Sequence, residues 1–264
     1  MIPLEGARLK VERVKEQAEL LMLDFSAFLK SDAYLLRQEI DDDAGEHVLF
    51  FDPGDVHPPL SWSVRIGEML YDLRSALDHF VWQLVIHDGG QPDQYTEFPI
   101  FDSEDKYLSS SRGGGLYKLR GVGPKGLAFI NGLQPYHTRN NPKVLHPLWV
   151  LHNLSIIDKH RFLHLSCTVC RLGNIRLKMV EGHGGGSVNF TITDAMRLKG
   201  RTEVARISLA ADPDSKMQVE FPHTLEVTFD DAPFVGRRPV REVFVVLVNE
   251  IDKILAAAER DLFA

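Results

Sequence analysis

The stretch "LSWSVRIGEMLYDLRSALDHFVWQLVIH", residues 60–87, decides the fold of this chain. Pro59 stands directly before it and "DGG" at 88–90 follows it, and these residue types commonly begin and end helices. Apolar residues within the stretch recur at helical spacing and fall along one line: Ile66, Met69, Leu70, Leu73, Leu77, Phe80, Val81 and Leu84. The stretch therefore predicts one long helix whose apolar face lies in the protein core.

The same helical spacing recurs near both ends of the chain. In residues 3–30 it is carried by Leu9, Val14, Ala18, Leu21, Phe25 and Phe28. In residues 240–262 it is carried by Phe244, Leu247, Val248, Ile251, Ile254, Leu255 and Ala258. Shorter helices are predicted at 103–110, 124–133 and 143–156. Because each of the three long helices has a face that must be buried, they predict a helical bundle.

Period-two patterns separate these helices and predict strands. Residues 33–40 and 46–52 read as a hairpin around "DDDAG". Six further runs follow in residues 158–232: "RFLHLSCTVC", "IRLKMV", "SVNFTIT", "VARISLA", "MQVEF" and "TLEVTF". We therefore predict an α+β fold, a bundle of long helices packed against an antiparallel sheet. It is expected to be a single domain, with a helical part at about 1–157 and 240–264, a sheet at about 158–232 and an extra hairpin at about 33–52.

Composition places the chain among ordinary globular proteins, since 44% of its 264 residues are hydrophobic and 25% are charged. The longest apolar run, Val243–Val248, is far shorter than the roughly 20 residues of a membrane span. The opening "MIPLEGARLKVERVKEQ" lacks the basic tip and apolar core of a secretory signal. We expect a cytoplasmic protein that does not contact a membrane.

Charge is distributed unevenly along the chain, whose net charge is −7. Residues 106–157 contain no Asp or Glu, yet they include Lys106, Arg112, Lys118, Arg120, Lys125, Arg139 and Lys143. Such asymmetry predicts a surface for phosphate or another anion. The alternative is that these cations pair with acids from elsewhere, such as those of residues 39–55.

The two cysteines, Cys167 and Cys170, stand in "CTVC", the spacing of a redox or metal-binding pair. Redox pairs of this kind work at the start of a helix, whereas the surrounding "FLHLSCTVCRL" alternates like a strand. The alternative is a pair of buried structural cysteines.

Within the central helix, four residues separate Arg74 from His79, and Asp72 lies close by. This arrangement resembles the motif of HEPN ribonucleases, small helical proteins that cut RNA without a metal in a cleft between two protomers. The resemblance implies a homodimer in which Arg74 holds the scissile phosphate, His79 acts as general acid and base, and Asp72 orients His79. The acid-free stretch would then be the RNA track.

The motif departs from the family at Ser75, where family members usually carry Asn, Asp or His. On an ideal helix Arg74 and His79 also point about 140° apart. The structural alternative pairs Arg74 with Asp78 at i to i+4 and lets His79 bond Asp72 or a neighbouring helix.

A metal site is a third hypothesis, because Asp72 and His79 share one face of the helix. Its further ligands would come from His146, His152, Asp158 and His160. The chain carries no HExxH motif, P-loop or dinucleotide fingerprint, and its predicted helices contain no Glu-x-x-His pair, so no cofactor is expected.

Two glycine-rich segments invite functional interpretations. "GVGPKG", residues 121–126, resembles the loop of helix-hairpin-helix DNA-binding modules, in which backbone N–H groups hold a phosphate. The alternative is a plain capping loop with proline at the helix start. "GHGGGS", residues 182–187, lies between two strand patterns and is interpreted as a hairpin turn.

At residues 158–161, "DKHR" stands where the helical period gives way to a strand. It is either a solvated turn or a cluster aimed at an anion. The anion-binding candidates are Arg112, Lys118, Arg120, Lys125, Lys159, His160 and Arg161. Together "LRSALDH" at 73–79, "LQPY" at 133–136 and "DKHR" resemble a bacterial protein family without an assigned activity, which implies a shared fold and no function.

Three functions therefore stay open. The first is a HEPN-like ribonuclease or an RNA-binding relative of one. The second is a non-enzymatic module that binds an anionic ligand or a partner protein through "DKHR" and the cationic stretch. The third is a helical-bundle metalloprotein.

Overall fold

The computed structural model describes residues 4–138, 146–172, 176–179, 186–190, 196–198, 200–209, 217–220 and 223–264. Their contacts divide the chain into two compact units, where the sequence predicted one domain. The first unit comprises the chain up to Met22, Leu60–His164 and Asp231–Ala264. The second comprises Leu23–Pro59 and Leu165–Asp230. Apart from residues 23–29, which are helical, the division follows the change from helical to strand-forming sequence.

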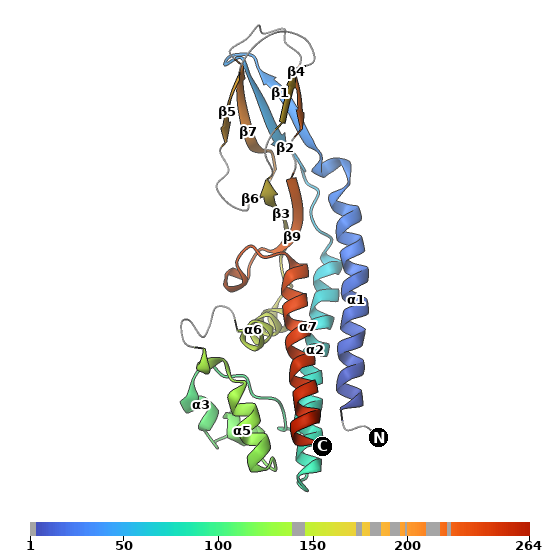
Figure 1. The fold of residues 1–264 in the computed structure, drawn as a ribbon, viewed down its shortest axis with the longest axis vertical. Coiled ribbons are helices and arrows are strands. Elements are labelled where there is room, and N and C mark those ends of the chain that lie inside the picture. Colours follow the sequence, from blue (N-terminus) through green and yellow to red (C-terminus); the bar gives the residue numbers. More distant parts are fainter. Residues whose placement is uncertain are drawn as a thin grey trace. The chain divides into compact units, whose positions relative to one another are not determined.

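The first unit is helical (Figure 1). Its α-helices are α1 (Glu5–Leu29, of which the part up to Met22 belongs here), α2 (Leu60–His87), α3 (Glu104–Leu108), α4 (Gly115–Lys118), α5 (Pro124–Gly132), α6 (Pro147–His160) and α7 (Val240–Leu262). Single 3₁₀ turns stand at Pro135–His137 and Pro233–Val235. The bounds of α2 and α7 agree with the prediction, whereas α6 continues to His160 and takes in most of "DKHR".

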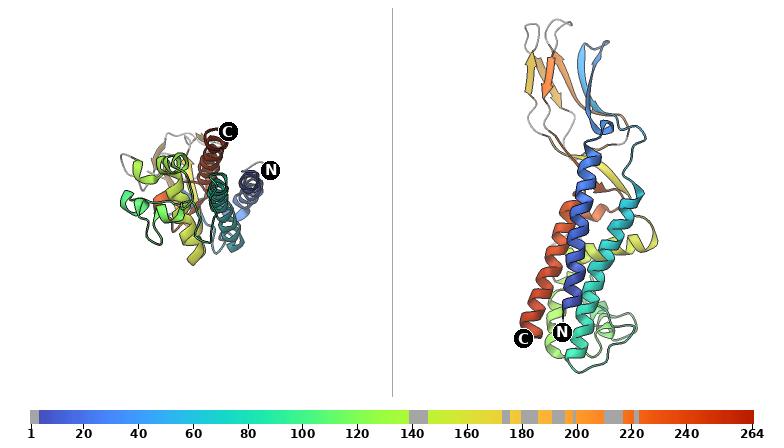
Figure 2. Two further views of the ribbon diagram at one scale, coloured as in Figure 1. Left: turned by 90° about the horizontal axis from the view of Figure 1, so that it is seen from below. Right: turned by 90° about the vertical axis from the view of Figure 1, so that its right-hand side faces the viewer.

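Within this unit, α1 runs antiparallel to α2 and α7, and α6 lies across the long helices (Figures 1 and 2). Ion pairs from Arg8 to Glu259 at 2.5 Å and from Lys15 to Asp252 at 2.8 Å join α1 to α7. All eight residues of the predicted apolar face of α2 are at most 2% exposed. The hydrophobic face that the sequence predicted is therefore the centre of the helical core.

Hydrogen bonds from "LQPY", residues 133–136, hold residues 97–101 inside the unit, a segment that has no regular secondary structure. The Gln134 side chain, 1% exposed, accepts a hydrogen bond from the Phe101 N–H at 3.0 Å and donates one to the Pro99 carbonyl at 3.0 Å. A buried amide satisfied in this way fixes local backbone. The role of this residue of "LQPY" is thus structural.

The second unit is built from antiparallel strands (Figure 1). They are β1 (Leu36–Asp41), β2 (Glu46–Phe51), β3 (Leu165–Leu172), β4 (Arg176–Met179), β5 (Gly186–Phe190), β6 (Met196–Arg197), β7 (Thr202–Leu209), β8 (Met217–Glu220) and β9 (His223–Phe229). In the described residues they form sheets with the orders β1-β2-β7-β5, β6-β3-β9 and β4-β8. The predicted hairpin is β1 and β2, paired from Leu36 with Phe51 to Asp41 with Glu46. The predicted α+β class with antiparallel strands is confirmed.

Cys167 lies in β3 and belongs to the core of the second unit. That core contains Tyr34, Leu49, Phe51, Cys167, Val169, Leu198, Val204, Ala205 and Ile207. Burial raises the pKa of the Cys167 thiol to about 11, so the thiolate that redox or metal chemistry needs is disfavoured. Cys167 therefore fits the structural alternative, while the side chain of Cys170 and the segment 182–185 lie outside the described residues.

Among the described residues, no helix combines the length and the apolar content that crossing a membrane requires.

Candidate functional site

Arg74 is held by contacts within its own chain. Its Nη2 donates to the Phe98 carbonyl at 3.0 Å and lies 3.4 Å from Oδ1 of Asp78. The same carboxylate oxygen accepts the Phe98 N–H at 2.8 Å. The two side chains therefore bond both backbone groups of Phe98, much as a neighbouring strand would. The i to i+4 pair of the structural alternative is present.

Asp72 and His79 face α1. Asp72 is 9% exposed, and its two oxygens contact Lys10 and Arg13 of that helix. His79 is exposed, and its Nδ1 lies 3.3 Å from the position that a Cβ on Gly6 would take. Within one chain the structure thus sets these two residues apart from Arg74, which bonds the 97–101 segment. A meeting of Arg74 and His79 across a twofold axis stays a prediction.

His152 of α6 lies in a cationic environment on the Arg74 side of α2. Burial is the main cause that lowers the pKa of its imidazole to about 4. The positive charges of Arg74 and Lys118 act in the same direction, and Glu97 and Asp102 act against them. Nη1 of Arg74 is buried and has no acceptor among the described residues, so its charge is only partly compensated there. Within the described part of the chain, no three His, Cys, Asp or Glu side chains are arranged to hold a metal ion. The proposed ligands Asp72 and His152 lie in different surroundings.

We expect acid to destabilise the helical unit through His152. The folded protein keeps this imidazole neutral down to a pKa of about 4, whereas the unfolded chain takes up a proton near 6.5. Stability should therefore fall as the pH drops from 6.5 toward 4, by about 3 kcal/mol in total. Urea unfolding at a series of pH values measures this loss.

The matched variants are His152→Gln and His137→Gln, the latter at an exposed histidine. The first should flatten the dependence between pH 4 and 6.5, and the second should leave it unchanged. An equal slope in His152→Gln would show that other groups cause it.

Three of the five cations in residues 106–125 contact partners close by in the chain. Lys118 pairs with Glu97 at 2.6 Å, and Arg120 pairs with Asp93 at 2.7 Å. The guanidinium of Arg112 lies 5.0 Å from the ring centre of Tyr95. These acids lie just before the acid-free stretch rather than in residues 39–55. Lys125 has no ion pair among the described residues, and positions 139 and 143 lie outside them.

The loop "GVGPKG" binds an acidic side chain from elsewhere in the same chain. The Gly123 N–H, just before α5, donates to Oδ2 of Asp88 at 2.7 Å. Gly121 has φ +89°, a conformation that favours glycine. The preceding helix α4 has only four residues. The backbone donor that would hold a DNA phosphate therefore holds a carboxylate of the same chain.

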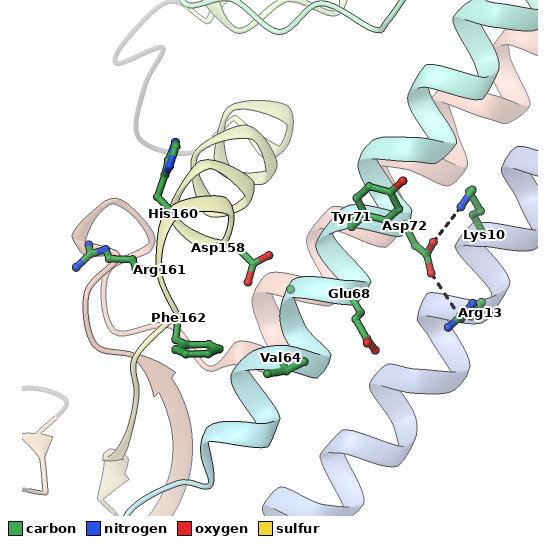
Figure 3. Close-up of a pocket in the computed structure, with 11 residues that line it drawn as sticks. Lys10, Arg13, Val64, Glu68, Tyr71, Asp72, Asp158, His160, Arg161 and Phe162 are labelled. Atoms are coloured by element: carbon green, nitrogen blue, oxygen red, sulfur yellow. Dashed lines mark hydrogen bonds and ion pairs between the residues drawn. The ribbon is translucent and has the colours of Figure 1, made fainter. Parts of the chain in front are cut away.

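A groove of about 770 Å³ opens between α1, α2 and the C-terminal end of α6 (Figure 3). All of its lining residues belong to the first unit. They are Lys10, Arg13, Val64, Gly67, Glu68, Tyr71, Asp72, Asp158, His160, Arg161 and Phe162. The groove brings together residues of "DKHR" and two cations about 150 positions earlier in the chain. We take it as the candidate functional site.

One wall of the groove is cationic. Nζ of Lys10 lies 3.0 Å from Oδ1 of Asp72, and Nε of Arg13 lies 3.6 Å from Oδ2. Two positive charges thus share one carboxylate. The Arg13 side chain is 65% exposed, so its terminal nitrogens are accessible to a ligand. The Asp72 carboxylate therefore neutralises only one of these two positive charges, and Glu68, another acid that lines the groove, has no ion pair with either cation.

The other wall is formed by the end of α6. The Asp158 side chain points toward α2, whereas His160 and Arg161 point away from it and lie at the rim (Figure 3). Arg161 pairs with Asp231 at 3.4 Å. Partial burial raises the pKa of the Asp158 carboxyl. The wall thus offers a desolvated carboxylate to the groove.

Apolar and aromatic side chains complete the groove. Tyr71 is 69% exposed, Phe162 50% and Val64 45%. Nζ of Lys10 lies 5.8 Å from the centre of the Tyr71 ring. Exposed aromatic rings beside charges of both signs are common in sites that bind organic ligands.

Sequence reasoning identified Asp72, Asp158, His160 and Arg161 but missed the other lining residues. Lys10 and Arg13 lie on a helix that the pattern predicted only as a core element. Gly67 carried a usable signal, because a glycine within a helix costs about 1 kcal/mol relative to alanine and often has a packing or functional reason.

No family model, curated protein or solved structure matches the chain.

Proposed function

We propose that this chain is a non-enzymatic binding module, and that the groove between α1, α2 and α6 holds a small organic ligand through an anionic group. The single observation that carries the proposal is the cationic wall, where Lys10 and Arg13 share Asp72 and Arg13 keeps exposed donors. A carboxylate or phosphate oxygen is the acceptor that an arginine binds best.

The dimensions of the groove support a ligand of modest size. Its volume of about 770 Å³ lies within the range of small-molecule sites, roughly 300–1,000 Å³. Val64, Tyr71 and Phe162 offer apolar contact area beside the charges. A ligand with an anionic head and an apolar body would use both features.

The position of Arg74 favours a binding module over the ribonuclease hypothesis. A phosphate clamp needs free guanidinium donors, whereas Arg74 bonds Phe98 and Asp78 and its side chain is only 16% exposed. The groove residues need no such rearrangement, since Arg13 is already exposed. The ribonuclease hypothesis depends on an assembly that would reorganise these contacts.

The proposal predicts a specific loss in Arg13→Gln. Titration with hexanoate and with hexyl phosphate, followed by calorimetry or NMR, should show binding to the parent protein that weakens about tenfold in the variant. A charge-assisted hydrogen bond lost at a partly exposed site has an effect of this size. Lys10 and Asp72 stay paired in the variant, so the fold should be unaffected.

Lys159→Gln is the matched control, because Lys159 is exposed and does not line the groove. It should bind both probes like the parent protein. Equal losses in the two variants would indicate nonspecific attraction to positive charge. Absence of binding by the parent protein would reject the proposal.

A further inference from the structure

The absence of a side chain at Gly67 leaves room for the Asp158 carboxylate to pack against α2. A Cβ at position 67 would overlap all three atoms of that carboxylate group. Gly67 lies within α2, where glycine is destabilising relative to alanine. Packing against a neighbouring helix backbone is the usual reason for such a glycine, and here the contacting group is an acid rather than an apolar side chain.

The Asp158 carboxylate has no hydrogen bond or ion pair with any described residue. Its partial burial therefore goes uncompensated, as the raised pKa of its carboxyl reflects. A desolvated acid without a partner is costly to the folded protein. Gly67 within the helix and the unpaired Asp158 are therefore two locally unfavourable features in direct contact, and both line the groove. Such coincidences are expected at functional sites.

The lysine and the two arginines that line the groove contact acids other than Asp158. Lys10 and Arg13 contact Asp72, and Arg161 contacts Asp231. A second lining acid, Glu68, is exposed and likewise has no ion pair in the described part of the chain. Among the described residues no cation pairs with Asp158, which leaves its carboxylate available to a positively charged group of a ligand.

We propose that Asp158, seated on Gly67, forms a second subsite that holds an ammonium or guanidinium group of the ligand. The ligand is then amphoteric, with its anionic group at Lys10 and Arg13 and its cationic group at Asp158. Phe162 and Tyr71 add aromatic faces, which attract cations. This inference rests on the proposed function of the groove and adds the second charge of its ligand.

The test compares three probes of one chain length: hexanoate, hexylamine and 6-aminohexanoate. Titrations of the parent protein should show 6-aminohexanoate binding at least tenfold more tightly than hexanoate. In Asp158→Asn this advantage should disappear while hexanoate binds as before. Glu19→Gln, at an exposed acid of α1 that does not line the groove, is the control for net charge and should keep the advantage.

Thermal unfolding without ligand gives an independent readout. Because the Asp158 charge is uncompensated, Asp158→Asn should melt at the same temperature as the parent protein or higher. A lower melting temperature would reveal a structural partner for the carboxylate and overturn the inference. So would an advantage of 6-aminohexanoate that survives in Asp158→Asn, or one that is absent from the parent protein while hexanoate binds. If neither hexanoate nor 6-aminohexanoate binds the parent protein, the proposed function itself fails.

Discussion

Phe80→Ala will destabilise the helical unit by about 3–5 kcal/mol, the usual cost of emptying a buried phenylalanine site. Phe80 is 0% exposed. Its ring centre lies 6.2 Å from that of Phe98, 6.0 Å from that of Phe129 and 6.4 Å from that of Phe263. These residues come from four separate parts of the sequence. Their side chains cannot easily fill the space left by the ring, since each belongs to a different packed segment.

Tryptophan fluorescence during urea unfolding measures this loss selectively. All three tryptophans, Trp62, Trp82 and Trp149, lie in the first unit. Tyr71→Ala is the matched control, because Tyr71 belongs to the same helix but is 69% exposed. It should cost less than about 1 kcal/mol. A similarly small loss in Phe80→Ala would show that Phe80 is not central to the core.

The long helices were predictable because local signals agree with tertiary burial. Helix α2 begins right after Pro59 and gives way to "DGG", and both of its ends fall where these residues predict them. The eight apolar residues of its predicted face all turn inward, since a 28-residue helix with one continuous apolar face can be buried in only one way. Position 9 shows the limit, because Leu9 shares the helical spacing of α1 and is nevertheless 65% exposed.

Long-range contacts explain what the sequence could not show. The sequence placed Asp72 on one helix face with His79, but Lys10 and Arg13 contact its two carboxylate oxygens. No local pattern links positions 10 and 72, so their pairing follows only from the docking of α1 on α2. The division into two units has the same origin, because it depends on which distant segments contact each other.

The candidate site was predictable only in part for the same reason. "DKHR" was identified from charge at the end of a helical pattern, yet α6 runs to His160 and directs Asp158 toward Gly67. The charges that sequence reasoning weighted most, such as Lys118 and Arg120, are paired with nearby acids. Charge counts along a sequence do not reveal which cations keep free donors. Exposure and pairing in three dimensions decide that.

Arg74→Met will lower the free energy of unfolding by about 2–3 kcal/mol and leave the affinity of the groove for hexanoate unchanged. Methionine keeps most of the aliphatic length but removes the hydrogen bond to the Phe98 carbonyl and the charge beside Asp78. Burial already raises the pKa of Asp78, so this carboxylate is left without its main compensating charge. Losing one partner of a largely buried pair costs about 3–5 kcal/mol, and the 34% exposure of the Asp78 side chain reduces that cost here.

His79→Ala is the companion variant that separates the binding module from the ribonuclease. His79 is exposed, so its loss should change stability by less than about 0.5 kcal/mol. If the ribonuclease hypothesis holds, the parent protein cleaves a single-stranded RNA and both variants lose this cleavage. If Arg74 instead fixes residues 97–101 to α2, only Arg74→Met loses stability and neither variant changes hexanoate binding. RNA cleavage therefore separates the two accounts, because a purely structural role of Arg74 predicts a loss of stability and no effect on RNA.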